Sequence, residues 1–307
     1  MNTKGFLNIS FAWLFAIIAG AFILFLAIYA VTQIIGTSQY QINTETAKSI
    51  DISFNQVETS FESAFSTSLT LPVESRIYND CEEFGNFGEQ LISISEKNFG
   101  KWPTPPEPLS SKNRYIFSEL PIQGKTFYLF SKPFNFPFKI ADLIYMTSST
   151  AEYCFKSPTI DIEYELESLN QPNLKIFPNC SEESVFVCFG PGNCDIKVNL
   201  ITKSVEKDSE EVYFEDDALM YAAIFSDQEV YECQVKRLMM RTENLAQLYI
   251  DKSKLISRTS GCSSNLNLLS LASQSNRLDN SRYLSSIKNL VEDIQNQNEL
   301  NRECKLW

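Results

Sequence analysis

Residues 11–31 read FAWLFAIIAGAFILFLAIYAV, a run made only of apolar and small side chains. This run lies inside a longer stretch, residues 5–44, that contains no charged side chain. At about 1.5 Å per helical residue the run spans roughly 30 Å, the thickness of the hydrocarbon core of a bilayer. It therefore predicts a membrane-spanning helix over residues 6–35, to which the rest of the chain is attached.

A cleaved signal peptide is the alternative explanation for this run. The apolar core of a signal peptide has about 7–15 residues and ends at a small-residue cleavage site. Residues 19–21 are small, but they lie in the middle of the run, where a cut would leave an apolar tail. A cut after Ala30 would lack a small residue at Ile28. We expect the helix to be retained as an anchor.

Small side chains recur on one face of the predicted helix. Such residues let transmembrane helices approach closely, so this face predicts packing against another helix. Alanine and glycine are also common in these helices without any such role, and this second interpretation stays open. The face consists of Ala12, Ala16, Gly20, Ala27 and Ala30.

Charge and cysteine content predict the orientation of the chain. Lys4 precedes the uncharged stretch, and the positive-inside rule then places the N-terminus in the cytoplasm. The chain has no histidine and no CxxC pair, which disfavours a zinc site and favours disulfides in an oxidising compartment. We expect a single-pass protein of the cell membrane, N-terminus in and C-terminus out, with the bulk of the chain extracytoplasmic. The disulfide candidates are Cys81, Cys154, Cys180, Cys188, Cys194, Cys233, Cys262 and Cys304.

Two cysteine pairings can be suggested from the sequence. Cys188 and Cys194 flank Gly190–Asn193, and we expect them to face each other across an antiparallel hairpin within 185–198. A Cys233–Cys262 bridge beside a long helix is a second suggestion. Eight cysteines allow 105 connectivities, so the remaining pairings stay open.

The chain beyond the anchor divides by texture into three parts. Residues 36–74 are polar with an apolar stripe at helical spacing, which predicts a helical stalk that packs on the globular part or mediates self-assembly. Residues 75–205 are expected to be β-rich. Residues 206–307 are expected to be helical. The stripe consists of Ile50, Phe54, Val57, Phe61 and Phe65.

Several strands and loops are predicted within the β-rich part. Ile160–Glu167 alternates apolar and acidic residues, as a half-buried strand does, and Lys125–Phe130 indicates another strand. Trp102–Pro108 must be an extended loop, either a stiff connector or a peptide ligand. Lys132–Lys139 is an aromatic loop broken by prolines, which is either packed in the core or an exposed contact patch.

The C-terminal part is expected to contain a helix of about 30 residues that begins at a capping box, Ser226 with Glu229. A short helix over 263–273 and a last helix marked by Ile287 and Ile294 follow. The acidic run from Glu206 to Asp217 lacks the spacing of a calcium loop and predicts a solvated loop. Its last residues, Asp216 and Asp217, are suited to a helix N-terminus.

The composition also limits the possible chemistry. Without histidine, histidine-based relays and histidine metal triads are excluded, and no other catalytic constellation is recognisable. A net charge of −12 argues against nucleic acid as a partner. The sequence therefore predicts no enzyme activity, no cofactor, no metal and no small-molecule ligand.

The start of the chain, Met1–Phe6 followed by the apolar helix, resembles type IV prepilins and their archaeal relatives. That resemblance implies a leader of residues 1–5, cut by a membrane peptidase between Gly5 and Phe6, and an apolar helix that packs in a filament core. It covers about the first 35 residues. Many pilins have glutamate where this chain has Ser10, and the outer part is large for a major pilin. The whole chain also resembles uncharacterised single-pass surface proteins of archaea.

Taken together, these features predict an α+β fold: a transmembrane helix with a stalk, a disulfide-stapled β-rich ectodomain and a helical C-terminal part. The expected function is that of a non-enzymatic surface, scaffold or assembly component that acts through contacts with a protein partner or with itself. A pilin-like filament or pseudopilin subunit is one alternative. A membrane-tethered enzyme that uses carboxylates is another.

Overall fold

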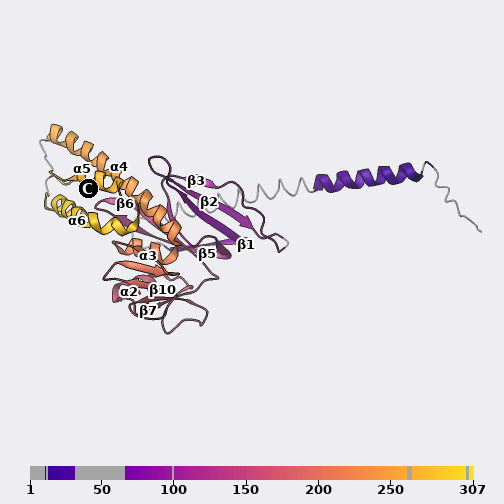
Figure 1. The fold of residues 1–307 in the computed structure, drawn as a ribbon, viewed down its shortest axis with the longest axis horizontal. Helices are drawn as coiled ribbons and strands as arrows, with labels where there is room; N and C mark the ends of the chain where they lie inside the picture. The colour runs from indigo at the N-terminus through magenta and orange to yellow at the C-terminus, as the bar shows by residue number, and fades with distance from the viewer. Residues whose placement is uncertain (1–10, 12, 32–65, 99, 261–264, 302–303) are drawn as a thin grey trace, which may run out of the picture. The chain divides into compact units, whose positions relative to one another are not determined.

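The computed structural model describes residues 11, 13–31, 66–98, 100–260, 265–301 and 304–307, in two compact units, residues 1–46 and 47–307 (Figure 1). The first unit contains a helix, Trp13–Val31, which among the described residues is the one long and apolar enough to cross a membrane. Of the helix predicted over residues 6–35, the part at 13–31 is confirmed as a helix. By length and composition it could be a membrane span or a signal sequence.

The small-residue face of this helix is partly described. Ala16, Gly20, Ala27 and Ala30 lie within the helix, and a Cβ built at Gly20 would meet no atom within 4 Å. Ala12, the two residues of the suggested leader cleavage (Gly5 and Phe6) and the stripe expected in the stalk lie outside the described residues.

The first sheet of the larger unit has six strands in the order β3-β2-β1-β5-β6-β4. Its neighbours pair antiparallel, except that β4 pairs parallel with β6. Residues 66–74, expected to end the stalk, belong to β1, a long strand whose first residues, 66–70, pair with β5. The strands are β1 (Ser66–Glu82), β2 (Glu89–Glu96), β3 (Leu109–Ser111), β4 (Tyr115–Phe117), β5 (Ile122–Asn135) and β6 (Lys139–Ser148).

The second sheet also has six strands, in the order β12-β11-β10-β9-β7-β8. β10, β11 and β12 pair antiparallel, whereas β8, β7, β9 and β10 pair parallel. The expected antiparallel hairpin within 185–198 is wrong, because the chain between β9 and β10 loops back and lays them parallel. The strands are β7 (Tyr153–Lys156), β8 (Leu174–Ile176), β9 (Val185–Phe189), β10 (Ile196–Asn199), β11 (Ser204–Lys207) and β12 (Glu210–Tyr213).

Residues expected to form a strand at 160–167 form a helix, α2 (Ile160–Leu169). Ile162, Leu166 and Leu169 are buried at helical spacing, while Ile160 and Tyr164 are 72% and 69% exposed. A strand would have placed Ile160 and Tyr164 on the same face as Ile162. Ile162 and Leu166 fit both the period of a strand and the period of a helix. Burial of Leu169 together with these two residues favours the helix.

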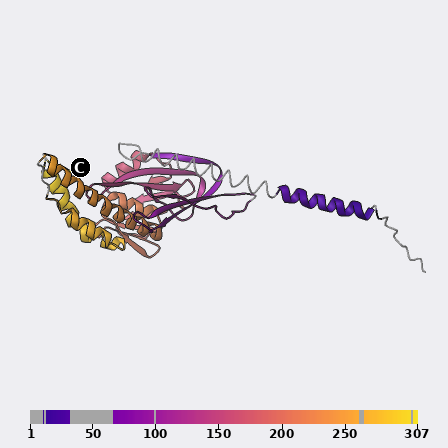
Figure 2. The same ribbon diagram turned by 90° about the horizontal axis from the view of Figure 1, so that it is seen from above.

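The C-terminal helices are α3 (Asp217–Phe225), α4 (Gln228–Ser260), α5 (Leu268–Asn276) and α6 (Leu284–Leu300), with a 3₁₀ turn η1 (Ser281–Tyr283). The long and last helices are confirmed, and the short helix spans 268–276 rather than 263–273. Helices α4, α5 and α6 lie side by side in both views (orange to yellow in Figures 1 and 2). The helical part begins at Asp217 rather than at 206, since residues 204–213 form the β11–β12 hairpin.

The start of α4 differs from the expected capping box. The Ser226 hydroxyl donates back to the Ala222 carbonyl, at 2.6 Å, and so belongs to the end of α3. The first backbone bond of α4 runs from the Tyr231 N–H to the Asp227 carbonyl. The proposed role of Asp216 is confirmed, because its carboxylate caps α3 by accepting from the Leu219 N–H at 2.9 Å.

The main hydrophobic core lies where α3 contacts β5 and β6 of the first sheet and β11 and β12 of the second. All residues from 218 to 225 are buried. The aromatic residues of 132–139 also belong to this core, since Phe134, Phe136 and Phe138 are at most 4% exposed. The buried interpretation of this segment is thus confirmed, although it forms the β5–β6 hairpin rather than a loop.

Candidate functional site

Six of the candidate cysteines form three described disulfides: Cys81–Cys233, Cys154–Cys180 and Cys188–Cys194. Cys304 is disulfide-bonded as well, and Cys262 lies outside the described residues. The Cys188–Cys194 pairing is confirmed although the hairpin that suggested it is not. The Cys233–Cys262 pairing is wrong, because Cys233 lies in the first turns of α4 against the end of β1, where Cys81 is its neighbour.

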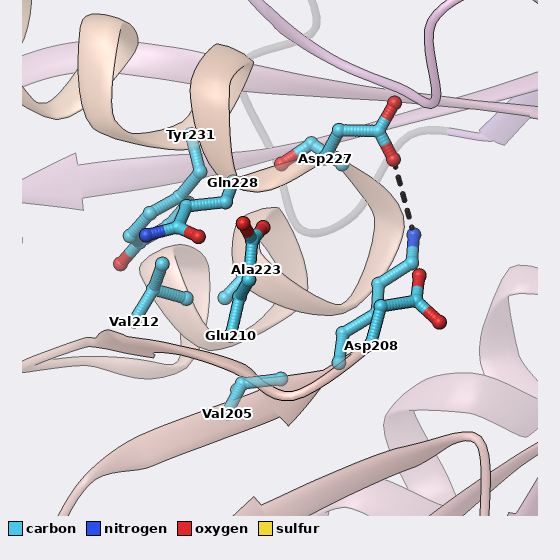
Figure 3. Close-up of a pocket in the computed structure, with 10 residues that line it drawn as sticks. Val205, Asp208, Glu210, Val212, Ala223, Asp227, Gln228 and Tyr231 are labelled. Atoms are coloured by element: carbon cyan, nitrogen blue, oxygen red, sulfur yellow. Dashed lines mark hydrogen bonds and ion pairs between the residues drawn. The ribbon is translucent and has the colours of Figure 1, made fainter.

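A small pocket lies where the β11–β12 hairpin meets the corner between α3 and α4 (Figure 3). The hairpin turns tightly at Asp208 and Ser209, whose φ angles of 51° and 68° are those of a two-residue hairpin turn. The pocket has a volume of about 250 Å³. Its lining residues are Val205, Lys207, Asp208, Glu210, Val212, Ala223, Ser226, Asp227, Gln228 and Tyr231.

The floor of the pocket is apolar and rigid. Val205 and Val212 face each other in the register of β11 and β12, and Ala223 of α3 closes the floor. The Tyr231 ring is buried, with its hydroxyl donating to the Tyr213 carbonyl at 2.6 Å. Because these groups are held by the sheet and two helices, the floor keeps its shape without a ligand.

The rim of the pocket carries one ammonium group and several carboxylates. Lys207 Nζ lies 3.5 Å from both Glu119 Oε1 and Asp227 Oδ1. Asp227 is held in place by the Leu120 N–H, which donates to its Oδ2 at 2.8 Å, and Glu119 accepts from the Tyr153 hydroxyl at 3.2 Å. The charge of Lys207 is thus already balanced by two carboxylates.

The other two carboxylates on the rim, those of Asp208 and Glu210, form no ion pair with Lys207. The Glu210 carboxylate points toward Gln228 at the start of α4 (Figure 3). With the Gln228 amide turned so that its nitrogen faces Glu210, that nitrogen donates to both carboxylate oxygens, at 3.1 and 2.6 Å. Asp208 and Glu210 are exposed residues of the hairpin. The rim therefore holds more negative than positive charge, an arrangement that attracts a cationic group.

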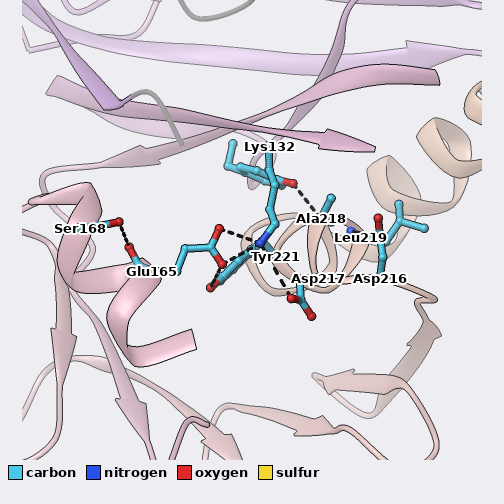
Figure 4. A network of polar contacts seen from close by, with 9 residues as sticks. Lys132, Glu165, Ser168, Asp216, Asp217, Ala218, Leu219 and Tyr221 are labelled. Atoms are coloured by element: carbon cyan, nitrogen blue, oxygen red, sulfur yellow. Dashed lines mark hydrogen bonds and ion pairs between the residues drawn. The ribbon is translucent and has the colours of Figure 1, made fainter. Parts of the chain in front are cut away.

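A second polar network lies beside α3 and joins β5 to α2 (Figure 4). Lys132 Nζ lies 2.6 Å from Glu165 Oε1, and the Tyr221 hydroxyl donates to the same carboxylate at 3.2 Å. Burial, with Glu165 nearby, raises the pKa of Tyr221 far above its ordinary value, and burial raises the pKa of the capping Asp216 to about 7. Lys132, Glu165 and Tyr221 thus bind one another, and their contacts hold β5, α2 and α3 together.

The carboxylates around the pocket fall into two groups. Here Asp227 and Glu119 are engaged by neighbours, while Asp208 and Glu210 are exposed to water. Across the described ranges, no group of three or more His, Cys, Asp or Glu side chains is placed to hold a metal ion.

The pocket was not recognisable from the sequence. Glu119 precedes Asp227 by more than 100 positions, and the run from Glu206 to Asp217 was expected to be a solvated loop. That expectation is wrong, because the first part of the run forms the antiparallel strands β11 and β12 with a tight turn between them. Alternate residues of these strands face the pocket. The one usable signal was Asp208–Ser209 between Val205 and Val212, a two-residue turn flanked by β-branched residues.

Comparisons of the chain with protein-family models, with curated proteins and with solved structures found no match.

Proposed function

We propose that this chain is a single-pass, membrane-anchored extracytoplasmic protein that acts without catalysis, as a surface or assembly component, by binding a protein partner. The pocket at the α3–α4 corner receives one basic side chain of that partner. The helix Trp13–Val31 supports the anchoring, and the disulfides support an oxidising compartment.

One observation carries the proposal: an apolar floor lies beneath an acidic rim in a pocket of about 250 Å³. Lysine and arginine side chains combine an apolar stem with a charged head, and they bury the stem while the head stays at a polar surface. The stem would lie on Val205, Val212 and Ala223, and the head would reach Glu210 and Asp208. The volume is below the roughly 300–1,000 Å³ of pockets for drug-sized ligands, so one side chain fits better than a cofactor.

Titration of the full-length protein in lipid nanodiscs with two small probes tests the proposal. The probes are N-acetyl-lysine methylamide and its uncharged counterpart, N-acetyl-norleucine methylamide. We expect the lysine probe to shift the methyl NMR signals of Val205, Val212 and Ala223 saturably, in the millimolar range. The norleucine probe should bind at least about fivefold more weakly, because it lacks the charge that the rim attracts.

Two neighbouring carboxylates make a matched pair of variants. Glu210→Gln should weaken binding of the lysine probe about two- to fivefold, the value of one exposed charge pair. Glu211→Gln removes the same charge one residue away, outside the pocket lining, and should leave binding unchanged. Equal binding of both probes, or an equal effect of both variants, would show that the pocket does not select a basic side chain.

A further inference from the structure

The outer side of the second sheet carries a groove of about 560 Å³ over β10, β11 and β12. It opens on the side opposite to the acidic pocket. Side chains alternate along the β11–β12 hairpin, so that Ser204, Glu206 and Glu211 line the groove while Val205, Lys207 and Glu210 line the pocket. The pocket and the groove therefore lie on opposite faces of the β11–β12 hairpin, so one residue of a ligand cannot occupy both.

One wall of the groove is the turn that follows β10, which presents apolar side chains to water. Ile201 is 95% exposed and Leu200 is 38% exposed. The turn is fixed by Asn199, whose side-chain oxygen accepts from the Ile201 N–H at 2.9 Å and from the Thr202 N–H at 3.1 Å. These hydrogen bonds fix the backbone of the turn in a conformation that leaves the Ile201 side chain exposed.

A second wall is the loop between β9 and β10, which contributes Phe189, Gly190 and Pro191. Because β9 and β10 are parallel, this loop begins at the same end of the sheet as the turn after β10. The Cys188–Cys194 disulfide closes this loop. Gly192 packs directly against that bridge, since a Cβ there would come within 3.1 Å of Cys188 Sγ. Each apolar wall is therefore fixed by local structure, one by a disulfide and the other by hydrogen bonds.

The floor of the groove is a charged ladder across three strands. Lys197, Glu206 and Glu211 are direct neighbours in register, and Lys197 Nζ lies 2.9 Å from Glu206. Glu211 accepts only a hydrogen bond, from the Tyr213 hydroxyl at 2.8 Å, in the contacts described for it. Two like charges directly opposite each other in a sheet are destabilising. The floor therefore has one negative charge in excess, at Glu211.

We propose that this groove binds an extended segment of a partner protein in which a basic residue is flanked by apolar residues. The basic residue lies at Glu211 and Glu206, and the apolar residues pack on Ile201, Leu200 and Pro191. A second copy of this chain is a poorer occupant, because two such floors facing each other would bring two excess negative charges together. The proposal does not depend on the acidic pocket.

Two fluorescent pentapeptides serve as probes, each with two isoleucines on either side of a central residue, which is arginine in one and glutamate in the other. Binding to the full-length protein in nanodiscs is measured by fluorescence anisotropy. The arginine peptide should bind saturably, and at least about tenfold more tightly than the glutamate peptide. Ile201→Asp should weaken it about tenfold or more, because the main apolar contact is lost. Glu211→Gln should weaken it about two- to fivefold.

Glu167→Gln, at an exposed position of α2 that lines neither the pocket nor the groove, is the control and should leave peptide binding unchanged. Because Ile201 is almost fully exposed, Ile201→Asp should melt at the wild-type temperature, which excludes misfolding as the cause of any loss. Equal binding of the two peptides, or wild-type affinity in both Ile201→Asp and Glu211→Gln, would overturn the proposal. A change of oligomeric state in Ile201→Asp, measured by light scattering, would also overturn it, because a second copy would then occupy the groove.

Discussion

Replacing Arg237 with methionine should lower the free energy of unfolding by about 3–5 kcal/mol, the cost of leaving buried polar groups without their partner. Arg237 lies in α4 and is fully buried against the first sheet. Arg237 forms no ion pair with any of the described residues. Its guanidinium is instead surrounded by oxygens of the backbone and of one amide.

These oxygens come from segments far apart in the sequence. Arg237 Nη1 donates to the Arg114 carbonyl at 2.9 Å and to Gln234 Oε1 at 2.7 Å. Further donors reach the carbonyls of Phe87 at 3.2 Å and Lys112 at 3.2 Å. Methionine can fill much of the volume but can donate to none of these groups. Each buried acceptor left unpaired costs on the order of 1–3 kcal/mol.

Urea unfolding of the full-length chain, followed by circular dichroism, measures this effect. Arg258→Met, at an exposed position of the same helix, is the control and should change stability by less than about 0.5 kcal/mol. Arg237→Lys keeps the charge but not the planar fork, and should fall between the two. A loss below about 1 kcal/mol in Arg237→Met would mean that the carbonyls are satisfied without the guanidinium.

Removal of the Cys81–Cys233 bridge, by alanine at both positions, is the second change for which we expect a large effect. This bridge joins β1 to α4 across a sequence separation of 152 residues. The entropy of closing so long a loop corresponds to about 5 kcal/mol in the unfolded-state model. The double alanine variant should therefore lose up to about 5 kcal/mol of unfolding free energy, measured as above.

The Cys188–Cys194 bridge provides the comparison, because it closes only six residues of sequence separation. The same model gives about 2 kcal/mol for its removal. Equal losses for the two double variants would contradict the loop-entropy account. Intact mass of protein from native membranes, without reduction, should show the six described cysteines as disulfides. Free thiols at these positions would argue against an oxidising compartment.

The two predicted losses should not simply add. Cys233 and Arg237 are one helical turn apart on α4, so both hold the same face of the helix on the first sheet. Residues that support one contact show coupling energies of about 0.5–3 kcal/mol. Gly88 belongs to the same contact, because its backbone has φ of 58° and a Cβ there would meet Arg237 Cγ at 2.7 Å.

Local patterns in the sequence predicted the elements that rest on one dominant period. The long helix α4, the last helix α6 and the strand around Lys125–Phe130 follow from their apolar spacing, and the Asp216 cap follows from its place before an apolar run. Where two periods coincide, the sequence could not decide. Ile162 and Leu166 fit a strand and a helix equally well, and only the tertiary burial of α2 selects the helix.

Contacts between residues far apart in the sequence could not be predicted, because they too depend on tertiary structure. The pairing of β9 with β10 depends on how the intervening loop returns, not on the strands themselves. Likewise the ion pairs of Lys207 unite Glu119, Lys207 and Asp227 from three separate segments, and no local pattern in any one segment indicates the other two. The network around Arg237 is of this kind too.

The central claim is that the acidic pocket binds a basic side chain of a protein partner outside the membrane. Photo-crosslinking in native membranes, with the crosslinking residue at position 228 in the pocket lining, tests this claim most directly. The control carries the same crosslinker at position 167, on the exposed side of α2. We predict one adduct specific to position 228, which maps next to a lysine or arginine of an extracytoplasmic segment and weakens with Glu210→Gln. Adducts that are shared by both positions, or that map to segments without a basic residue, would contradict the account.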